Sequence, residues 1–306
     1  MYIFGPVPSR RLGLSLGVDL IAGKKVCNNN CIYCELGRTL NLTNKRQVFV
    51  ETEDVLSEIK DFFNKGGETD FVTFSGSGEP TLALNLGEVI SAVKKIRDKK
   101  IALLTNSVLF CDENVRKEAA LSDVVLPSID AGSEEVFKKI NRPHESVDFN
   151  RMISGLIKFS KEPGVDIKPE VLIVKGFNDS DTEVLKIKKI IDSMDNVSEI
   201  QVNTVVRSRA EKYAEPAEPE KLKRISGLLG KRAVVIGEYK GGKTPTGENL
   251  ASMVISGLKK RPMTINDISQ AFEAPKSQIK ILVEKLHARG EIEKEEFEGK
   301  EFYKGK

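Results

Sequence analysis

The sequence predicts an α/β protein: a partial or complete (β/α) barrel over residues 1–239, followed by a small winged helix-turn-helix domain over residues 247–306. Between about residues 14 and 236, short β-branched runs alternate with longer amphipathic runs, a pattern typical of βαβ units around a parallel sheet. Six or seven such units suit a barrel, although an open doubly wound sheet would show the same periodicity.

The individual elements follow from hydrophobic periodicity. The predicted strands are Leu14–Ile21, Phe71–Ser75, Ile101–Leu104, Val124–Ile129, Ile167–Val174, Glu199–Val205 and Ala233–Ile236. Between them, apolar residues recur at helical spacing in three groups: Val55, Ile59, Phe62 and Phe63; Val89, Val93 and Ile96; and Val184, Ile187, Ile190 and Ile191. These groups predict helices that bury one face against the sheet.

Residues 240–246 are rich in Gly, Lys and Thr and predict a linker before the C-terminal domain. Beyond it, Leu250, Val254 and Leu258 fit one helix, and Thr264 with Asp267 resembles a capping box and predicts the start of a second. Pro275 is predicted to start a third helix, and Glu298 with Gly299 to turn a final hairpin. Three helices and a hairpin in this order favour a winged helix-turn-helix.

Composition excludes several classes of protein. The chain is 40% hydrophobic and 30% charged, which excludes a disordered chain. The net charge of +3 is too small to indicate a polyanionic partner by itself. No apolar run approaches the roughly 18 residues of a membrane helix. Prolines and arginines interrupt the first residues where a signal peptide would be apolar. We therefore expect a cytoplasmic protein with no membrane contact.

Three of the four cysteines fall within eight residues: Cys27, Cys31 and Cys34. This clustering favours a bound metal over a disulfide framework. A structural zinc site needs four ligands, and neither of the two histidines, at 144 and 287, is placed to complete one. Cys111 could supply a fourth ligand, but its apolar neighbours predict a buried structural thiol. A [4Fe–4S] cluster held by three cysteines would keep one iron open for chemistry.

A second motif, Ser75-Gly76-Ser77-Gly78-Glu79-Pro80, follows the second predicted strand. Glycines at the end of a strand allow the backbone to approach a ligand closely, and Glu79 offers an acceptor for a cationic amine. Taken alone, the segment fits a plain Gly-rich turn equally well.

Together the two motifs resemble the radical S-adenosylmethionine (radical SAM) superfamily, whose cysteine loop has the spacing Cys-x3-Cys-x2-Cys with an aromatic residue, here Tyr33, before the last cysteine. Gly78, Glu79 and Pro80 match the Gly-Gly-Glu-Pro-like segment that holds the methionine amino group in that family, with Ser77 replacing its first glycine. The resemblance implies one [4Fe–4S] cluster on the three cysteines and S-adenosylmethionine as cofactors.

The resemblance also implies further cofactor contacts. Asn106, Ser128 and Asp130 lie at the C-terminal ends of the third and fourth predicted strands, where related enzymes bind the ribose hydroxyls and the methionine carboxylate. Helix capping is the alternative for Asp130. Lys168 could neutralise the carboxylate or face solvent. The basic segment Pro8-Ser9-Arg10-Arg11 is expected to be solvated, with contact to a phosphate or a carboxylate as the alternative. Arg142-Pro143-His144-Glu145 is expected to terminate a helix, with a substrate contact as the alternative.

The implied reaction is reductive cleavage of S-adenosylmethionine to a 5′-deoxyadenosyl radical, which abstracts hydrogen from a substrate. An external electron donor such as ferredoxin or flavodoxin is implied with it. Within the superfamily the chain resembles iron–sulfur oxidoreductases related to 4-demethylwyosine synthase, including its segments Ser128-Ile129-Asp130 and Asn141-Arg142-Pro143. That synthase carries a second cluster on upstream cysteines, whereas no cysteine precedes Cys27 here, so the substrate stays open.

Three functions are compatible with these observations. The first is a radical SAM enzyme acting on RNA, a peptide or a small molecule. The second is a radical SAM peptide- or protein-maturation enzyme or activase, and the third a non-enzymatic iron–sulfur transcription regulator. A regulator would not need a site for S-adenosylmethionine. Residues 247–306 hold eleven Lys and Arg against ten Asp and Glu; this near balance favours docking of a substrate, RNA or polypeptide, over binding of a DNA operator.

Overall fold

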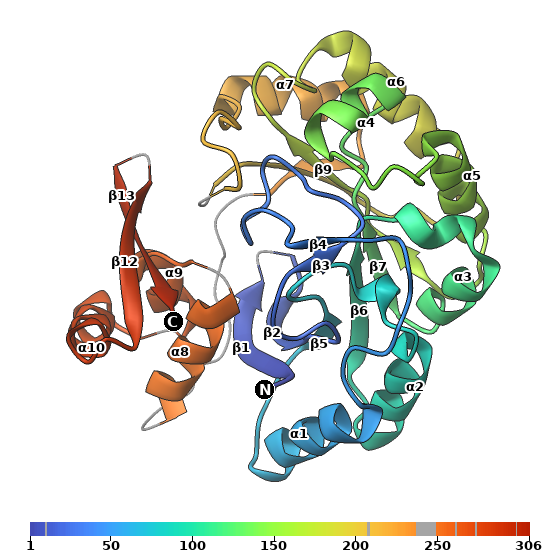
Figure 1. Ribbon diagram of the computed structural model, residues 1–306. Coiled ribbons are helices and arrows are strands. Elements are labelled where there is room, and N and C mark those ends of the chain that lie inside the picture. The colour runs from blue at the N-terminus through green and yellow to red at the C-terminus, as the bar shows by residue number, and fades with distance from the viewer. Residues whose placement is uncertain (10, 207–208, 237–248, 261, 273, 298) are drawn as a thin grey trace.

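The structure, a computed structural model, describes residues 1–306 except 10, 207–208, 237–248, 261, 273 and 298. Most of the chain forms a curved, largely parallel sheet with helices on its outside (Figure 1). The first six strands in spatial order are β1 (Ile3–Ser9), β2 (Gly13–Val18), β5 (Phe71–Phe74), β6 (Lys100–Thr105), β7 (Val124–Pro127) and β8 (Asp166–Ile167). A second group of three hydrogen-bonded strands consists of β9 (Glu170–Ile173), β10 (Ile200–Thr204) and β11 (Ala233–Val235).

The two groups of strands form one open barrel. Pro169, which has no backbone N–H to donate, interrupts the strand and separates β8 from β9. The Ile129 N–H nevertheless donates to the Glu170 carbonyl at 2.8 Å, so β9 continues the curve from the end of β7. Among the described residues β1 and β11 do not pair with each other, so the barrel is partial, one of the two predicted forms.

All seven predicted strands are present, and the run Ile167–Val174 is divided between β8 and β9. The sequence did not predict β1, nor the short strands β3 (Val26–Cys27) and β4 (Asn41–Leu42). Strand β1 contains Pro6 and Pro8, which argue against a central strand. It is the antiparallel edge strand beside β2, the position in which a sheet tolerates proline.

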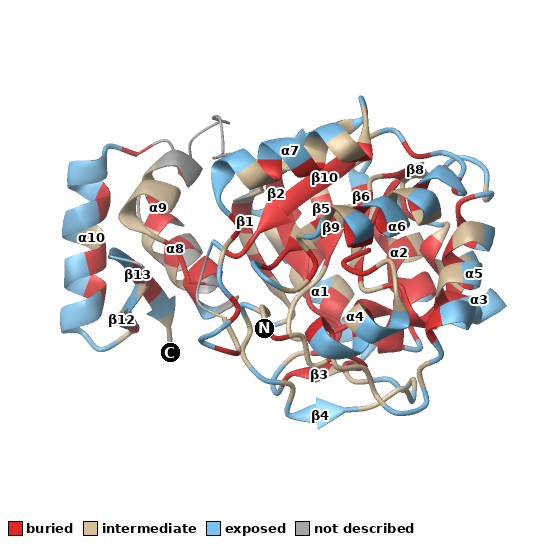
Figure 2. Ribbon diagram, turned by 90° about the horizontal axis from the view of Figure 1, so that it is seen from above, coloured by how far each residue is buried: buried red, intermediate tan, exposed pale blue. Residues whose placement is uncertain are grey.

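Helices cover the outer face of the barrel (Figure 2). They are α1 (Thr52–Asn64), α2 (Leu86–Ile96), α3 (Glu113–Ala119), α4 (Glu134–Ile140), α5 (Phe149–Phe159), α6 (Asp181–Asp192) and α7 (Pro219–Leu229), with 3-10 turns η1 (Pro80–Leu82) and η2 (Val108–Cys111). The predicted apolar faces are buried: Val55 and Ile59 of α1 and Val184 and Ile187 of α6 all pack into the main core.

The C-terminal elements have a core of their own. They are α8 (Asn249–Lys260), α9 (Ile265–Ala271), α10 (Lys276–Ala288), β12 (Ile292–Phe297) and β13 (Lys300–Gly305). Helix α8 packs against edge strand β1 (Figure 1). The approach is close at Gly257, where an added Cβ would lie 3.1 Å from Val7 Cγ1. This C-terminal module therefore covers the exposed edge of the barrel sheet.

The order of three helices and a hairpin matches the prediction, and the capping box of Thr264 and Asp267 is present. Assignment as a winged helix-turn-helix domain stays a prediction, as do the domain boundaries. The predicted linker, residues 240–246, and Glu298 of the predicted turn lie outside the described residues. Within the described part of the chain, no helix is long and apolar enough to cross a membrane.

Candidate metal centre and cofactor site

The cysteine loop, residues 27–42, begins on β3 and is fixed against the Gly-Glu-Pro turn. The Val26 N–H donates to the Ser77 carbonyl at 3.2 Å, and the Glu79 N–H donates to the Val26 carbonyl at 3.1 Å. A Cβ at Gly78 would lie 1.7 Å from the Val26 carbonyl oxygen. Only glycine permits this approach, which places Glu79 beside the strand that carries Cys27.

The other side of the cysteine loop rests on the segment after α4. The Asn30 N–H donates to the Asn141 carbonyl at 2.9 Å, and the His144 N–H donates to the Asn28 carbonyl at 2.8 Å. Helix α4 does end at Ile140, as the motif beginning at Arg142 predicts. The same segment also supports the cysteine loop, a role that the sequence alone did not indicate.

Each of the three cysteine sulfurs in the cysteine loop accepts a hydrogen bond from a nitrogen donor. Cys27 Sγ accepts from the Asn29 N–H at 3.4 Å and from Asn106 Nδ2 at 3.5 Å. Cys31 Sγ accepts from Asn141 Nδ2 at 3.5 Å, and Cys34 Sγ from Lys25 Nζ at 3.0 Å. Donors of this kind stabilise sulfur that carries negative charge, as the thiolate ligands of a metal do.

Burial alone would keep two of these thiols protonated. It raises the pKa of Cys31 to about 12 and the pKa of Cys27 well above its ordinary value, with nearby acidic groups and thiols adding to the shift. A metal that binds thiolates must displace these protons, so metal binding and deprotonation are coupled here.

The donor set fits an iron–sulfur cluster better than a single ion. Among the described residues, no three His, Cys, Asp or Glu side chains converge closely enough to share one metal ion. A cluster does not require that convergence, because each thiolate binds a different iron. Several buried polar atoms of the cysteine loop and the segments near it have no hydrogen-bond partner in the part of the chain that the structure describes: both amide atoms of Asn29, Asn141 Oδ1 and Ser107 Oγ. Such atoms are expected where a bound group belongs.

Glu79 lies buried at the centre of a hydrogen-bond network. Its Oε1 accepts from the Thr81 and Thr105 hydroxyls at 2.6 and 2.7 Å, and its Oε2 accepts from the Asn106 N–H at 2.8 Å. Burial raises the pKa of Glu79, and these hydrogen bonds oppose that rise. Oε2 accepts one such bond and retains capacity for a second donor, as a ligand ammonium would supply. Pro80 follows at the first position of η1.

Asp130 joins the cysteine loop to the sheet. Its carboxylate accepts from the Tyr33 hydroxyl, from Asn141 Nδ2 at 3.1 Å and from the Leu172 N–H of β9 at 2.9 Å. Burial raises its pKa to about 6 against these hydrogen bonds. No cap hydrogen bond to α4 involves Asp130, so the helix-capping alternative is not supported.

The structure brings most of the predicted residues together. Asn106 Nδ2 reaches Asn28 Oδ1 at 2.6 Å as well as Cys27, so this residue links the cysteine loop to Glu79. Ser128 follows β7, and its hydroxyl has no partner among the described residues. Lys168 is different: it directly follows β8, and its Nζ lies 3.6 Å from Asp166 Oδ2 at the start of that strand.

A cavity of about 180 Å³ lies between the cysteine loop and strands β9 and β10, lined by Tyr33, Cys34, Arg11, Glu170 and Asn203 among others. Arg11 forms an ion pair with Glu170 at 2.7 Å, and its side chain is only 18% exposed. The expectation that the N-terminal basic segment is solvated is therefore wrong for Arg11; Arg10 lies outside the described residues. Because β1 was not predicted, nothing in the sequence indicated that the Arg11 side chain would be largely buried.

Cys111 also departs from expectation. It ends η2 and is exposed, so the prediction of a buried thiol is wrong. Its neighbours Leu109 and Phe110 are buried, and the 3-10 turn directs the last residue outward.

The model of the radical SAM superfamily matches residues 24–187, and the chain belongs to that superfamily. It is accordingly an enzyme, with a [4Fe–4S] cluster on three cysteines and S-adenosylmethionine as its cofactors, and it requires a reducing electron donor. Cys27, Cys31 and Cys34 provide three cysteines within the matched region.

Relatives extend the match over nearly the whole chain. A UPF0026 protein of Methanocaldococcus jannaschii is 30% identical over 98% of this chain and 94% of that protein. A Brachyspira hyodysenteriae protein named GTPase Obg is 31% identical over 96% of this chain, which spans only 43% of that protein. Among solved structures, a radical SAM methyltransferase from Sphaerobacter thermophilus has a TM-score of 0.53 at 17% identity, covering 74% of this chain and 67% of that chain. This last likeness concerns the fold alone.

Proposed function

We propose that Cys27, Cys31 and Cys34 hold the [4Fe–4S] cluster and that the protein generates a 5′-deoxyadenosyl radical there for hydrogen abstraction from its substrate. The observation that carries the proposal is the hydrogen-bonded connection that Asn106 makes between the two motifs. Asn106 contacts Cys27 Sγ through its side chain and Glu79 Oε2 through its backbone. The groups expected to bind the cluster and those expected to bind the methionine amine thus share one hydrogen-bonded unit.

When bound, the cluster supplies the electron that cleaves the sulfonium of S-adenosylmethionine. The residues of this chain bind and orient. Glu79 would accept from the methionine ammonium through Oε2, while Gly78 and Pro80 fix the turn that carries it. The Ser128 hydroxyl is available to a ribose or carboxylate oxygen.

Asp130 would act through its neighbours. Its hydrogen bonds to Tyr33 and Asn141 hold the cysteine loop, so we assign it a positioning role together with any contact to the cofactor. A role for Lys168 towards the methionine carboxylate stays a prediction, since its ion pair is with Asp166. The electron donor is proposed to be a ferredoxin or flavodoxin, and RNA and polypeptide are the macromolecular substrates to test.

The test is anaerobic incubation of cluster-loaded protein with dithionite and S-adenosylmethionine, followed by measurement of 5′-deoxyadenosine. The proposal predicts its formation by the wild type and none by Cys31→Ala. A wild-type protein that holds the cluster and forms no 5′-deoxyadenosine would overturn the proposal and favour a non-enzymatic iron–sulfur protein. If 5′-deoxyadenosine is formed, comparison of tRNA nucleosides and of the proteome between a deletion strain and the wild-type strain would identify the substrate.

A further inference from the structure

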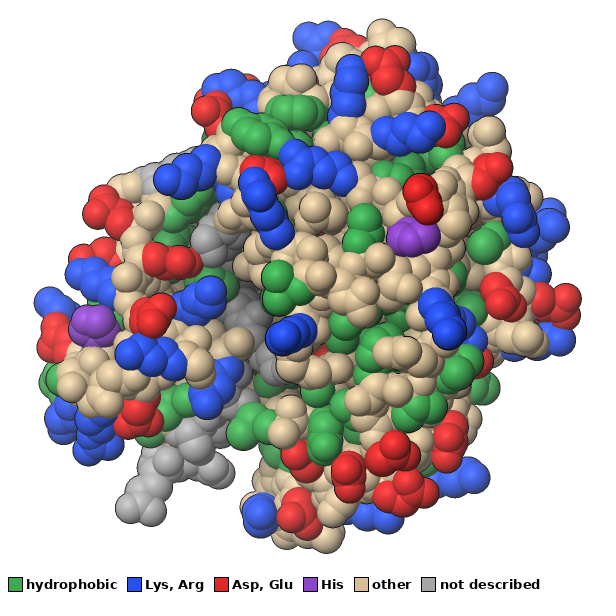
Figure 3. Space-filling model, in the orientation of Figure 1, with side chains coloured by type: hydrophobic (Ala, Val, Ile, Leu, Met, Phe, Trp, Pro, Cys, Tyr) green, Lys and Arg blue, Asp and Glu red, His purple; other side chains and the backbone are tan. Residues whose placement is uncertain are grey.

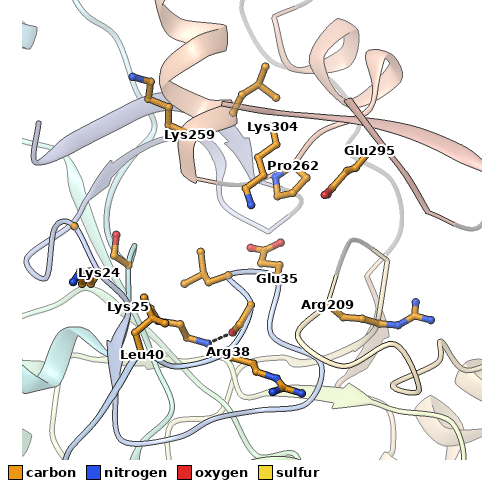
Figure 4. A pocket seen from close by; sticks show the side chains of 15 residues that line it. Lys24, Lys25, Glu35, Arg38, Leu40, Arg209, Lys259, Pro262, Glu295 and Lys304 are labelled. Atoms are coloured by element: carbon orange, nitrogen blue, oxygen red, sulfur yellow. Dashed lines mark hydrogen bonds between the residues drawn. The ribbon is translucent and has the colours of Figure 1, made fainter. Parts of the chain in front are cut away.

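A second, larger cavity of about 600 Å³ lies between the barrel and the C-terminal module. We call it the interdomain cleft. Its barrel side includes Lys24, Lys25, Glu35, Arg38 and Arg209, which come from the approach to β3, from the cysteine loop and from the segment after β10. The C-terminal module contributes Lys259 from α8, Pro262 from the segment after α8, and Glu295 and Lys304 from the hairpin (Figure 4).

The interdomain cleft is strongly basic although the whole chain is nearly neutral. Its lining holds the six cationic side chains of Lys24, Lys25, Arg38, Arg209, Lys259 and Lys304, against the two carboxylates of Glu35 and Glu295. Lys24, Lys259 and Lys304 form no ion pair with any residue that the structure describes. In Figure 3, Lys and Arg side chains stand both on the C-terminal module and on the neighbouring part of the barrel. Such a concentration of one sign attracts anions.

The interdomain cleft adjoins the cysteine loop on its barrel side. Glu35, Leu36, Gly37 and Arg38 directly follow Cys34, and Lys25 contacts Cys34 Sγ. Arg209, also on the barrel side, reaches the C-terminal module: its guanidinium lies 4.2 Å from the Phe297 ring centroid of the hairpin, a cation–π contact. A molecule bound in the cleft would therefore lie against the cysteine loop and touch the C-terminal module.

Apolar residues complete the lining. Leu36, Leu40 and Pro262 lie among the cations, and Leu40 is 70% exposed. A ligand that fits must combine anionic groups with an apolar or aromatic surface. Nucleotides have that combination, since lysines bind phosphate as point charges and apolar side chains pack against a base. The volume of the cleft is also within the range of small-molecule sites.

We propose that the interdomain cleft binds a phosphate-bearing nucleotide, either free or as part of an RNA chain, and presents it to the cysteine loop. This inference rests on the proposed function and narrows its substrate class. The C-terminal module then contributes to substrate binding through Lys259 and Lys304, whatever the family of its fold.

The experiment measures binding to anaerobically loaded, full-length protein by fluorescence anisotropy. The two labelled probes are a single-stranded oligoribonucleotide and an acidic peptide of the same net charge. Unlabelled GTP and AMP serve as competitors of the oligoribonucleotide. The variant is Lys259→Ala/Lys304→Ala. Its matched control is Lys285→Ala/Lys300→Ala, which removes two exposed lysines of the same module that do not line the cleft.

If Lys24, Lys259 and Lys304 each contact one phosphate, a rise from about 50 to about 200 mM salt should weaken oligoribonucleotide binding by about 20-fold. The double variant, with one such lysine left, should lose only about 3-fold over that range, and the control should behave as the wild type. Competition by GTP or AMP would assign the site to a free nucleotide, and its absence to RNA.

Equal salt dependence in variant and wild type would overturn the inference, as would preferential binding of the acidic peptide. Formation of 5′-deoxyadenosine by the same wild-type preparation is measured separately. Protein that forms it but fails the binding test contradicts only the nucleotide assignment. Protein that binds the oligoribonucleotide but forms no 5′-deoxyadenosine contradicts the proposed function instead.

Discussion

Lys25 donates from its ammonium group to Cys34 Sγ at 3.0 Å and to the Gly37 carbonyl at 2.6 Å. The residue is only 8% exposed, and a buried ammonium needs partners of this kind. The contact places a positive charge directly against one of the three sulfurs proposed to bind the cluster. Lys24, the preceding residue, is exposed and makes no such contact.

We predict that Lys25→Met makes the cluster harder to reduce. Loss of a nearby positive charge disfavours the added electron, and a hydrogen bond to a charged group is worth about 1.5 kcal/mol or more. For a one-electron couple this corresponds to about 60 mV in the negative direction. A redox titration followed by electron paramagnetic resonance measures the shift. Lys24→Met is the matched control, and equal potentials in the two variants would contradict the assignment.

One cluster per chain is expected on Cys27, Cys31 and Cys34. Alanine at any of these positions should abolish it, because a three-thiolate site has no spare ligand. Cys111→Ala should keep it, since Cys111 is exposed on η2. Iron analysis of reconstituted protein should give about four irons per chain. Twice that value, or loss of the cluster in Cys111→Ala, would contradict a single site.

Gly78→Ala should damage the site through the backbone. The added Cβ would overlap the Val26 carbonyl oxygen and push β3, with Cys27, away from the Glu79 turn. Overpacking typically costs about 1–3 kcal/mol, and we expect both a lower melting temperature and a lower iron content. Gly227→Ala on α7 is the control, because nothing lies within 4 Å of its Cβ position. Similar iron content in both variants would show that the close approach is dispensable.

Truncation after Gly242 should leave cluster assembly intact, because every residue proposed to bind the cluster or S-adenosylmethionine lies before it. Turnover of the physiological substrate should fall. The truncated chain should also be less stable, because it loses the contacts between α8 and edge strand β1. The uncovered edge strand should in addition promote aggregation. Iron content and the melting temperature of the truncated chain measure both effects. A truncated chain that stays folded but binds no iron would show that the module belongs to the catalytic fold.

The sequence predicted the parallel strands because each is a buried β-branched run flanked by helical periodicity. It missed β1, whose prolines oppose a strand unless the strand lies at an edge. The cysteine spacing and the Gly78-Glu79-Pro80 segment also identified the core of the site.

What the sequence could not supply were contacts between segments far apart in the chain. Asn141 donates a hydrogen bond to Cys31, which lies 110 residues earlier in the chain, and another to Asp130, which lies 11 residues earlier. Only the fold brings these three residues together. Lys25 resembles any surface lysine until its burial is known. The exposure of Cys111 depends on how η2 ends, which local hydrophobicity does not reveal.

The most direct test of the account is the electron paramagnetic resonance spectrum of the reduced cluster with and without S-adenosylmethionine, in the wild type and in Glu79→Gln. We predict that the cofactor changes the wild-type spectrum and that Glu79→Gln keeps the cluster but binds the cofactor several-fold or more weakly, because a charged hydrogen bond is worth roughly 1–3 kcal/mol. A wild-type spectrum that stays the same at saturating S-adenosylmethionine would contradict the central claim that the cysteine loop and the Glu79 turn form one cofactor site.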